Sequence, residues 1–504
     1  VSTGNEADLN VVDFVEYFLA DPDTKVVALY LEGLRDADRL RGVVAGSTKP
    51  IVAFKVGRSE AGARSATSHT GALAGSDRLY DAYFEQLGII RAQTFGDLLD
   101  VAGALATSSR PRGKRLGVLT STGGAGVLVT DACGVAGFDA PPPDAPLVEV
   151  LSGLLTDEAS VADRNPVDVT LAGLKPEIFT IAIRAMLASP TYDALVVVVG
   201  SSGIANPELA SAPMIASARE SDKPLLAYVS PYAPNVVSHL NRSGVPAFDT
   251  PEGVAAALSA MVKPRRSVAL VPRQERPRAG SYPSGPLNEQ EALDLFASFG
   301  VPIVAQRAAA TPREAAEAAQ HLGEHVVLKV LSRAIAHKSE AGGVLTNVPG
   351  HAVQPRAEEL LARVRVRAPD AEIEGLLVQE QVPAGGVEMI LGMIRDPQLG
   401  PAILLGAGGV AAEVLQDTVL RLAPLTPDEA REMIRALKSA PLLTGYRGRP
   451  ASDVEALAQA IVAFSQMVVA LGDRLLEAET NPLFVLPAGD GVKAADGLAV
   501  LAAG

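Results

Sequence analysis

Tryptophan is absent from this sequence of 504 residues, and cysteine occurs once, at Cys133. A single thiol excludes an intramolecular disulfide, which suits the reducing environment of the cytoplasm. Aromatic residues are also scarce, at 4% of the chain. The hydrophobic core must therefore be built mainly from Ala, Val and Leu.

Positive charge is in short supply, because 44 Lys and Arg face 58 Asp and Glu and leave a formal net charge of -14. This balance argues against a nucleic-acid surface, which needs clustered Lys and Arg. Long apolar runs are missing as well. The longest, such as residues 194–200, have the length of a buried strand and not the ~20 residues of a membrane span. We see no signal peptide, and we expect a cytoplasmic protein that binds neither nucleic acid nor membranes.

The sequence does contain a repeated alternation of strands and helices. Apolar strands are expected at 25–31, 50–56 and 115–121, and a helix at 77–88. Another helix is expected over 8–21, with Asp8 as its N-cap. Nearly continuous apolar strands that alternate with helices predict parallel sheets covered on both faces, in an α/β fold.

The chain is long enough for about two to four domains. The strand–helix pattern restarts near residue 105, and a stretch rich in Pro, Arg and Ser then interrupts it. A helical segment at 287–302 begins a new domain after that stretch. We therefore divide the chain into domains at 1–104 and 105–262, a linker at 263–286, and a last domain at 287–504.

His69 lies in "SHTGALAGSD", a loop built almost wholly from small residues. A buried core histidine usually has bulky apolar neighbours, whereas glycine gives a loop backbone freedom and allows close approach to another surface. An imidazole with a pKa of about 6.5 is a good nucleophile and can carry a phosphoryl group. On spacing alone, a polar loop histidine without a function is the simpler interpretation.

His337 lies in a second loop of the same kind, "SRAIAHKSEAGGVLTNV", beside Lys338 and a pair of glycines. Two such loops in different halves of the chain could be two stations for one phosphoryl group. The alternative is a basic turn that follows a strand.

Gly123, Gly124 and Gly126 follow a strand and open a helix. Their backbone N–H groups at a helix N-terminus would form an anion site. The stretch is neither a Walker A motif nor a complete dinucleotide fingerprint, so a tight strand-to-helix turn explains it equally well. Glu32 also follows an apolar strand. Its carboxylate could orient an imidazole, or it could simply begin a solvated turn.

Several polar residues of the last domain suit a nucleotide site. Lys329 lies in an expected strand, and Glu380 and Glu388 flank the segment "QVPAGG". Asn481 and Asp496 lie on strands that we expect to be neighbours, and their oxygens suit Mg²⁺ that holds ATP phosphates. Each of these residues could separately be a surface charge on an edge strand.

These motifs together resemble the NDP-forming acyl-CoA synthetases, relatives of succinyl-CoA synthetase. "KVGRSEAGARSATSHTGALAGSD" (55–77) is similar to their phosphohistidine segment, and "HKSEAGGV" (337–344) to their second histidine loop. "GLLVQEQVPAGGVEMILGM" (375–393) and "ETNPL" (479–483) resemble their ATP-grasp half. The resemblance implies flavodoxin-like succinyl-CoA-ligase domains with parallel sheets, followed by an ATP-grasp domain.

The resemblance also implies a reaction and its residues. An ADP-forming ligase of this kind joins a small carboxylic acid to coenzyme A with ATP and Mg²⁺, through a phosphohistidine and an acyl phosphate. His69 would be phosphorylated, Glu32 would orient it, and His337 would relay the phosphoryl group. The remaining roles follow the same resemblance: phosphate binding by Gly123, Gly124 and Gly126; nucleotide binding by Lys329, Glu380, Val382 and Glu388; and magnesium binding by Asn481 and Asp496.

Relatives fused in this order normally begin with a CoA-binding domain, whereas "VSTGNEADLN" resembles the middle of their second domain. The resemblance therefore implies a truncated chain, or a partner domain or subunit that binds CoA, in addition to a possible homo-oligomer. Two other functions are compatible with the motifs. One is a non-catalytic sensor of nucleotides or acyl-CoA, and the other is an ATP-grasp carboxylate–amine ligase, which would not need residues 1–262.

Overall fold

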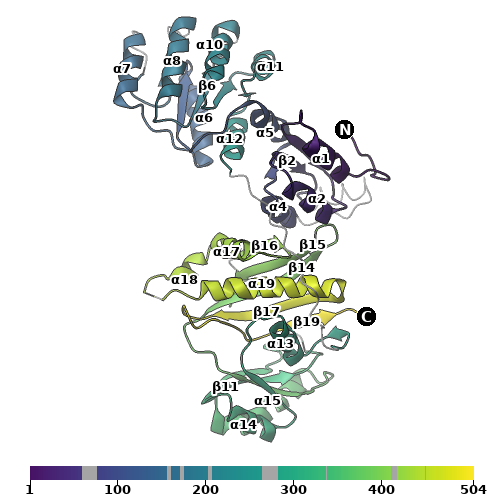
Figure 1. Cartoon of the computed structure of the whole chain (residues 1–504). Coiled ribbons are helices and arrows are strands. Elements are labelled where there is room, and N and C mark those ends of the chain that lie inside the picture. The colour runs from purple at the N-terminus through teal and green to yellow at the C-terminus, as the bar shows by residue number, and fades with distance from the viewer. Residues whose placement is uncertain are drawn as a thin grey trace. The chain divides into compact units, whose positions relative to one another are not determined.

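The computed structural model describes residues 1–59, 77–155, 161–170, 175–201, 207–263, 282–335, 338–409, 417–448 and 450–503. These residues form two compact units, which Figure 1 shows coloured along the chain. The first unit contains most of the described residues before 264. The second contains those from 282 onward, together with residues 36–38 and helix α4 (Asp77–Gln86).

The first unit begins with a three-stranded parallel sheet. Its order is β1 (Val27–Leu31), β2 (Ile51–Lys55) and β3 (Ile90–Arg91), and the neighbouring helices are α1 (Val11–Ala20), α2 (Ala37–Ala45) and α5 (Phe95–Thr107). The expected N-cap of α1 is wrong. Asn10, and not Asp8, caps this helix. The Asn10 side chain accepts from the Asp13 N–H, and the Asp13 side chain accepts from the Asn10 N–H.

A five-stranded parallel sheet forms the rest of the first unit, with the order β5–β4–β6–β7–β8. This is the flavodoxin-like order that the resemblance implied. The strands are β4 (Leu116–Thr120), β5 (Val167–Asp168), β6 (Ala194–Val199), β7 (Leu225–Val229) and β8 (Ala247–Phe248). The helices are α6 (Gly123–Val135), α7 (Ala145–Leu154), α8 (Pro176–Ala188), α10 (Pro207–Arg219), α11 (Pro234–Arg242) and α12 (Pro251–Val262).

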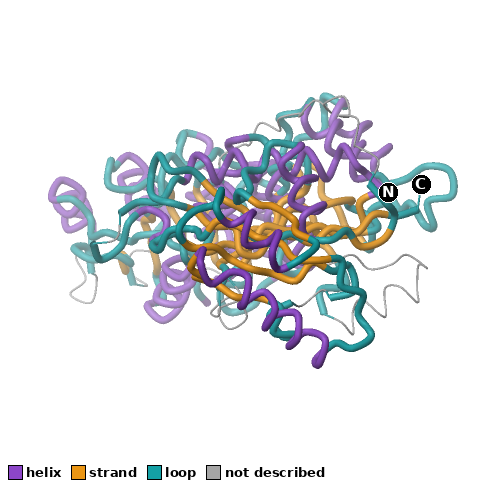
Figure 2. The backbone as a smooth tube through the Cα atoms, turned by 90° about the horizontal axis from the view of Figure 1, so that it is seen from below, coloured by secondary structure: helices purple, strands orange, loops and turns teal. Residues whose placement is uncertain are grey.

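Helices cover both faces of this sheet, as the apolar strands predicted. Every residue of β6 is buried, and alternate residues enter two different cores. Val197 and Val199 pack with the core that contains α8, whereas Val196 and Val198 pack with the core that contains α12. Figure 2 colours the strands orange and the helices purple along the backbone of the chain. The side chains of β6 are apolar throughout because neither face meets water.

Asp100 on α5 is partly buried beside α12. A Cβ atom added to Gly253 of α12 would lie 3.3 Å from the Asp100 carboxylate. Burial, and then the charges of Asp249 and Asp97, raise the pKa of Asp100 from 3.8 to about 6. Because the unfolded chain keeps the lower pKa, the folded state loses stability as the pH rises through this interval.

We expect Asp100→Asn to raise the free energy of unfolding by about 1–2 kcal/mol near pH 7. The full shift would correspond to roughly 3 kcal/mol, and partial exposure reduces it. Near pH 4 the carboxyl is protonated in the folded state but about half ionised in the unfolded state, so the gain should fall to roughly a fifth of its value at pH 7. Urea unfolding at the two pH values measures the difference. An equal gain at both pH values would show that the charge of Asp100 is not the cause.

The second unit contains two antiparallel sheets. A four-stranded sheet has the order β10–β13–β11–β12, from β10 (Gln306–Ala309), β11 (His325–Leu331), β12 (Val344–Pro349) and β13 (Gly375–Glu380). A seven-stranded sheet has the order β16–β15–β14–β17–β19–β9, with β18 beside β17. Its strands are β9 (Gly285–Pro286), β14 (Val387–Asp396), β15 (Gly400–Ala407), β16 (Thr418–Leu422), β17 (Leu475–Val485), β18 (Val492–Ala494) and β19 (Leu498–Leu501).

Helices pack on these two sheets. They are α13 (Glu289–Ser298), α14 (Pro312–Ala319), α15 (Val353–Arg367), α17 (Pro427–Ala436), α18 (Ala440–Thr444) and α19 (Val454–Leu471), with short 3₁₀ turns at Gly350–Ala352 and Gly472–Arg474. The segment Val454–Arg474 is long and apolar enough to cross a membrane. Its helix α19 nevertheless runs along the large sheet (Figure 1), and side chains such as Ile461, Phe464 and Val468 belong to the core of this unit.

Helix α4 joins the second unit although its sequence lies among strands of the first. The Gln86 amide donates to the Leu422 carbonyl at 3.1 Å and accepts from the Leu422 N–H at 2.7 Å. Arg78 donates to the Thr418 hydroxyl at 2.7 Å. α4 therefore packs against β16, the edge strand of the large sheet.

Candidate active site

The glycine-rich turn after β4 has the geometry of an anion site. Thr122 is the N-cap of α6, and its side chain makes no capping hydrogen bond. A Cβ atom on Gly126 would lie 3.0 Å from the Thr120 methyl group, so the turn packs tightly on β4. A Cβ atom on Gly124 would meet nothing within 4 Å. The surface at Gly124 is therefore open, whereas a Cβ atom on Gly123 would lie 3.4 Å from the Asp168 carboxylate. The first amides of a helix have no partner within the helix and can bind an anion.

This turn lies where the strand order of the sheet reverses. β4 has β5 on one side and β6 on the other. At the end of β6, a Cβ atom on Gly200 would lie 2.0 Å from the Thr122 hydroxyl, so the two strand ends meet closely. Open parallel sheets bind ligands at such a reversal. The predicted residues Gly123, Gly124 and Gly126 thus occupy a favourable position.

Glu32 lies at the corresponding edge of the small sheet. It is half-buried and follows β1, whose last residue Leu31 pairs with Lys55 at the end of β2. The chain continues from β2 toward His69. His69 and His337 both lie outside the described residues, so their predicted roles stay predictions.

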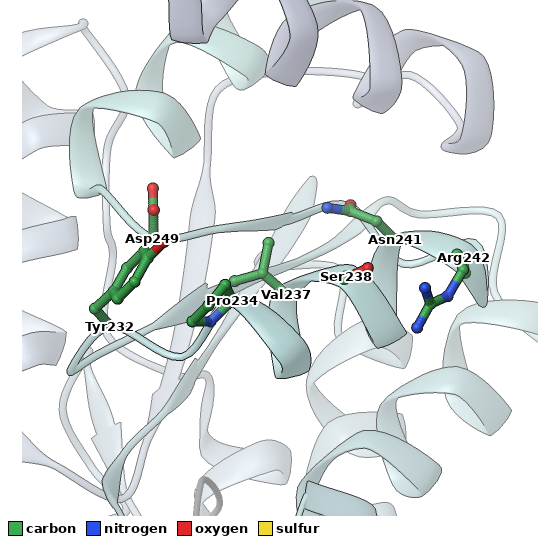
Figure 3. A pocket seen from close by; sticks show the side chains of 7 residues that line it. All are labelled: Tyr232, Pro234, Val237, Ser238, Asn241, Arg242 and Asp249. Carbon is green, nitrogen blue, oxygen red and sulfur yellow. The ribbon is translucent and has the colours of Figure 1, made fainter.

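A pocket of about 510 Å³ lies at the ends of β7 and β8 (Figure 3). Tyr232 and Asp249 follow these strands, and one face of α11 provides the rest of the wall. The Asn241 side chain is already engaged, because it donates to the Ala247 carbonyl and accepts from the Ala247 N–H. None of the predicted site residues lines this pocket.

In the second unit, a short segment at residues 493–496 gathers most of the predicted nucleotide site. The Lys493 ammonium lies 2.8 Å from both carboxylate oxygens of Glu380. The Ala495 carbonyl accepts from the Lys329 ammonium at 2.8 Å. The Ala495 side chain packs against a small apolar cluster that contains Val382. The segment ends with Asp496, so Lys329, Glu380, Val382 and Asp496 are near neighbours.

Lys329 belongs to a buried cluster of four charges. Its Nζ lies 2.6 Å from Oε1 of Glu289 and 3.6 Å from a carboxylate oxygen of Asp496. Lys338 Nζ lies 3.0 Å from Oε2 of Glu289 and 3.8 Å from Asp496. Gln379 donates its amide to Oε1 of Glu289 at 3.1 Å. Two ammonium groups therefore share the same two carboxylates.

Burial and the neighbouring opposite charges shift the pKa values of this cluster in opposite directions. Burial raises the pKa of Glu289, and the Asp496 charge adds to the rise, whereas Lys329 and Lys338 oppose it. Burial acts to lower the pKa of Lys329, but the Glu289 and Asp496 carboxylates outweigh it and the pKa of Lys329 rises. Lys329 therefore stays an ammonium group, as a phosphate ligand must.

The side chains of Glu380, Val382 and Glu388, the other predicted nucleotide residues, differ in how far neighbouring residues already occupy them. Glu380 accepts from the Ala305 N–H at 2.8 Å in addition to its Lys493 pair, so its carboxylate is largely engaged. Val382 packs with Val304 and Leu486 in the apolar cluster. Glu388 is exposed on β14, and a Cβ atom on Gly409 would lie 3.0 Å from its carboxylate.

Asn481 lies on β17, but Asp496 lies in the loop between β18 and β19 and not on a strand, as the sequence had led us to expect. Glu479 pairs with Leu498, and the Ala495 N–H donates to the Pro482 carbonyl, so both residues lie between these contacts. Within the described part of the chain, no three His, Cys, Asp or Glu side chains cluster as a metal site. An amide oxygen and one carboxylate nevertheless fit Mg²⁺, which usually takes few protein ligands and completes its shell with phosphates and water.

The sequence did not predict Glu289 or Lys493 as site residues, and it indicated Lys338 only as the neighbour of His337. Glu289 follows Asn288 in the first turn of α13, where an acidic residue is commonplace. Its partners Lys329 and Gln379 are 40 and 90 residues away. The sequence showed only that Glu289 begins an amphipathic helix, and this does not distinguish a buried site residue from a solvated one.

Two family models and several known proteins match this sequence. Residues 1–105 match the family described as succinyl-CoA ligase like flavodoxin domain, and residues 279–501 match the ATP-grasp domain. The chain is 33% identical to acetate–CoA ligase [ADP-forming] I of Archaeoglobus fulgidus, over 97% of its own length and 72% of that protein.

Two further relatives match parts of the chain. The α and β subunits of acetate–CoA ligase [ADP-forming] I of Pyrococcus furiosus match 52% and 40% of it at 36% and 38% identity, over 57% and 85% of their own lengths. A solved structure of dinucleotide-forming acetyl-coenzyme A synthetase 1 from Ca. Korarchaeum cryptofilum, with coenzyme A and Ca-AMPCP, is 37% identical over 43% of this chain and 93% of that one, with a TM-score of 0.41. The 33% identity to the Archaeoglobus enzyme extends over nearly the whole of this chain, and two domains match family models. This chain therefore belongs to the ADP-forming acyl-CoA ligase family.

Proposed function

We propose that this chain catalyses the phosphoryl-transfer steps of an ATP-dependent acid–CoA ligase, with His69 as the phosphorylated residue. Enzymes of this family use ATP, Mg²⁺ and coenzyme A. The observation that supports the proposal best is the buried lysine cluster at Lys329, beside the apolar cluster at Val382. It combines fixed positive charge for phosphates with an apolar wall for a base.

The proposed reaction begins at the second unit. Lys329 binds the phosphates, while Glu380, Val382 and Glu388 bind the rest of the nucleotide. Asn481 and Asp496 would hold Mg²⁺, which would offset negative charge on the phosphate oxygens. The terminal P–O bond breaks, ADP leaves, and a P–N bond forms on His337. That P–N bond then breaks as the phosphoryl group forms a new P–N bond on His69, which leaves His337 free again.

The later steps take place at the first unit. Glu32 orients His69, and the amides at Gly123, Gly124 and Gly126 bind the phosphoryl group. The group passes to the oxygen of a small carboxylic acid, and the thiolate of CoA then displaces phosphate from the acyl phosphate. We propose a cytoplasmic enzyme whose domains are 1–104, 105–262 and 287–504. A CoA-binding domain or subunit, or a second copy of the chain, would be its partner.

The direct test is product analysis. The protein is incubated with ATP, Mg²⁺, CoA and one acid from a panel of short, branched and aryl carboxylic acids. We expect acyl-CoA, ADP and phosphate in equal amounts. Formation of AMP and pyrophosphate would contradict an ADP-forming reaction. Binding of ATP without turnover or protein labelling would favour the sensor.

The magnesium site has a separate test. We expect Asp496→Asn to raise the Mg²⁺ concentration for half-maximal ADP formation by roughly tenfold, because one of two protein ligands loses its charge. Asp428→Asn is the control, since its side chain is 91% exposed on α17. Activity is titrated with Mg²⁺ at fixed ATP. An unchanged midpoint for Asp496→Asn would mean that other residues hold the ion.

A further inference from the structure

Lys338, the residue that follows His337, is held firmly in the second unit. It is 8% exposed, and its carbonyl accepts from the Gly343 N–H at 2.7 Å. A Cβ atom on Gly343 would lie 2.6 Å from the Val330 side chain, so only glycine lets this turn pack on β11. The turn thus fixes the backbone of Lys338 beside the strand that carries Lys329.

Glu289 joins the two lysines at the base of the cluster. Its carboxylate has no exposed surface and contacts Lys329 through one oxygen and Lys338 through the other. Oε2 lies 3.0 Å from the Lys338 ammonium, but the geometry gives it no well-aligned hydrogen bond among the described residues. The Asn288 capping box holds the backbone of this first helical turn. Glu289 is therefore a fixed counter-charge for both ammonium groups.

Asp496 completes the cluster from the other side, and it is held much more loosely. Its side chain is 33% exposed, and its oxygens lie 3.6 and 3.8 Å from the two ammonium groups. A partly exposed carboxylate at such distances is easier to displace than a buried one at 2.6 Å. The two ammonium groups are therefore held tightly on the Glu289 side and only weakly on the Asp496 side.

We propose that Lys338 is a second phosphate-contacting residue, which binds the terminal phosphates of ATP together with Lys329. Glu289 is the positioning residue that keeps the two ammonium groups side by side. This inference rests on the proposed function, because it assigns the phosphates of ATP to this cluster. It also places a positive charge directly next in sequence to the proposed relay histidine.

Nucleotide affinity tests the role of Lys338. Dissociation constants for MgATP and for AMP are measured by calorimetry on the whole chain. Lys338→Met should weaken MgATP binding by about tenfold or more, the scale of one charge-assisted contact. AMP binding should change by less than about threefold, and Lys338→Arg should keep most of the affinity for MgATP. Lys438→Met, an exposed lysine of the same unit, is the matched control.

The alternatives have distinct signatures. Unchanged MgATP affinity in Lys338→Met would overturn the proposal. Equal losses for MgATP and AMP, with a lower melting temperature, would also overturn it, because they indicate a structural role only. If the unaltered protein binds neither nucleotide, the proposed function itself fails.

The role of Glu289 needs its own variant. Glu289→Gln should weaken MgATP binding by about tenfold, because the two ammonium groups lose their shared acceptor and repel each other. Glu289→Asp should recover part of the affinity. Glu317→Gln, on the exposed face of α14, is the matched control. Equal or tighter binding of MgATP by Glu289→Gln would contradict the positioning role.

Discussion

Lys329→Met is expected to lower ATP-dependent acyl-CoA formation by at least roughly 100-fold, the scale of losing one preorganised charge contact to a reacting phosphate. The ammonium group lies in a fixed place, because it donates to Glu289 at 2.6 Å and to the Ala495 carbonyl at 2.8 Å. Methionine fills similar space but cannot bind a phosphate. The measurement is kcat/KM for ATP.

Stability must be separated from catalysis in this variant. Removing one partner of a buried pair can destabilise a protein by about 3–5 kcal/mol, since a charge is left without its counter-charge. The double variant Lys329→Met, Glu289→Gln removes one charge of each sign and should melt closer to the unaltered protein. Its activity should remain as low as that of the single variant. A folded Lys329→Met protein with activity within tenfold of the original would contradict the nucleotide role.

His69→Ala is expected to abolish turnover, with a loss of at least roughly 1000-fold, because no other group can replace the nucleophile. Affinity for MgATP should stay within about twofold, since the nucleotide residues at Lys329, Glu380 and Val382 belong to the second unit. Turnover and calorimetry on the same preparation measure both quantities. His239→Ala, on α11, serves as a matched control and should retain full turnover. A His69→Ala protein with more than about a tenth of the original turnover would contradict the role of His69.

The sequence was informative where local pattern decides the structure. Apolar stretches placed β2, β4 and β6 within about two residues of their observed bounds. Asn481 lies on β17 as expected, whereas Asp496 was expected on a neighbouring strand and lies in the loop between β18 and β19. Continuous burial leaves a clear mark on a strand, because every side chain must be apolar.

The sequence was uninformative where distant contacts decide the structure. Glu289 has the same local context as a solvated helix-start acid, and only its pairing with β11 makes it buried. Helix α4 lies in sequence between β2 and β3, yet Gln86 bonds Leu422, 336 residues away. Even the cap of α1 was misplaced, since Asp8 and Asn10 are both good N-cap residues and only the backbone geometry selects Asn10. Such features need the folded arrangement of the chain.

The most direct measurement of the central claim is transfer of the terminal phosphoryl group from ATP to the protein. The chain is incubated with γ-labelled ATP and Mg²⁺, and the label is tested for lability in acid and stability in base. We predict a label with both properties in the unaltered protein, which the acid and CoA then remove. In His69→Ala we predict a label only on the peptide that carries His337, which the acid and CoA do not remove. A label in His69→Ala that the acid and CoA still remove, or an unaltered protein that binds ATP and takes up no label, would contradict the account.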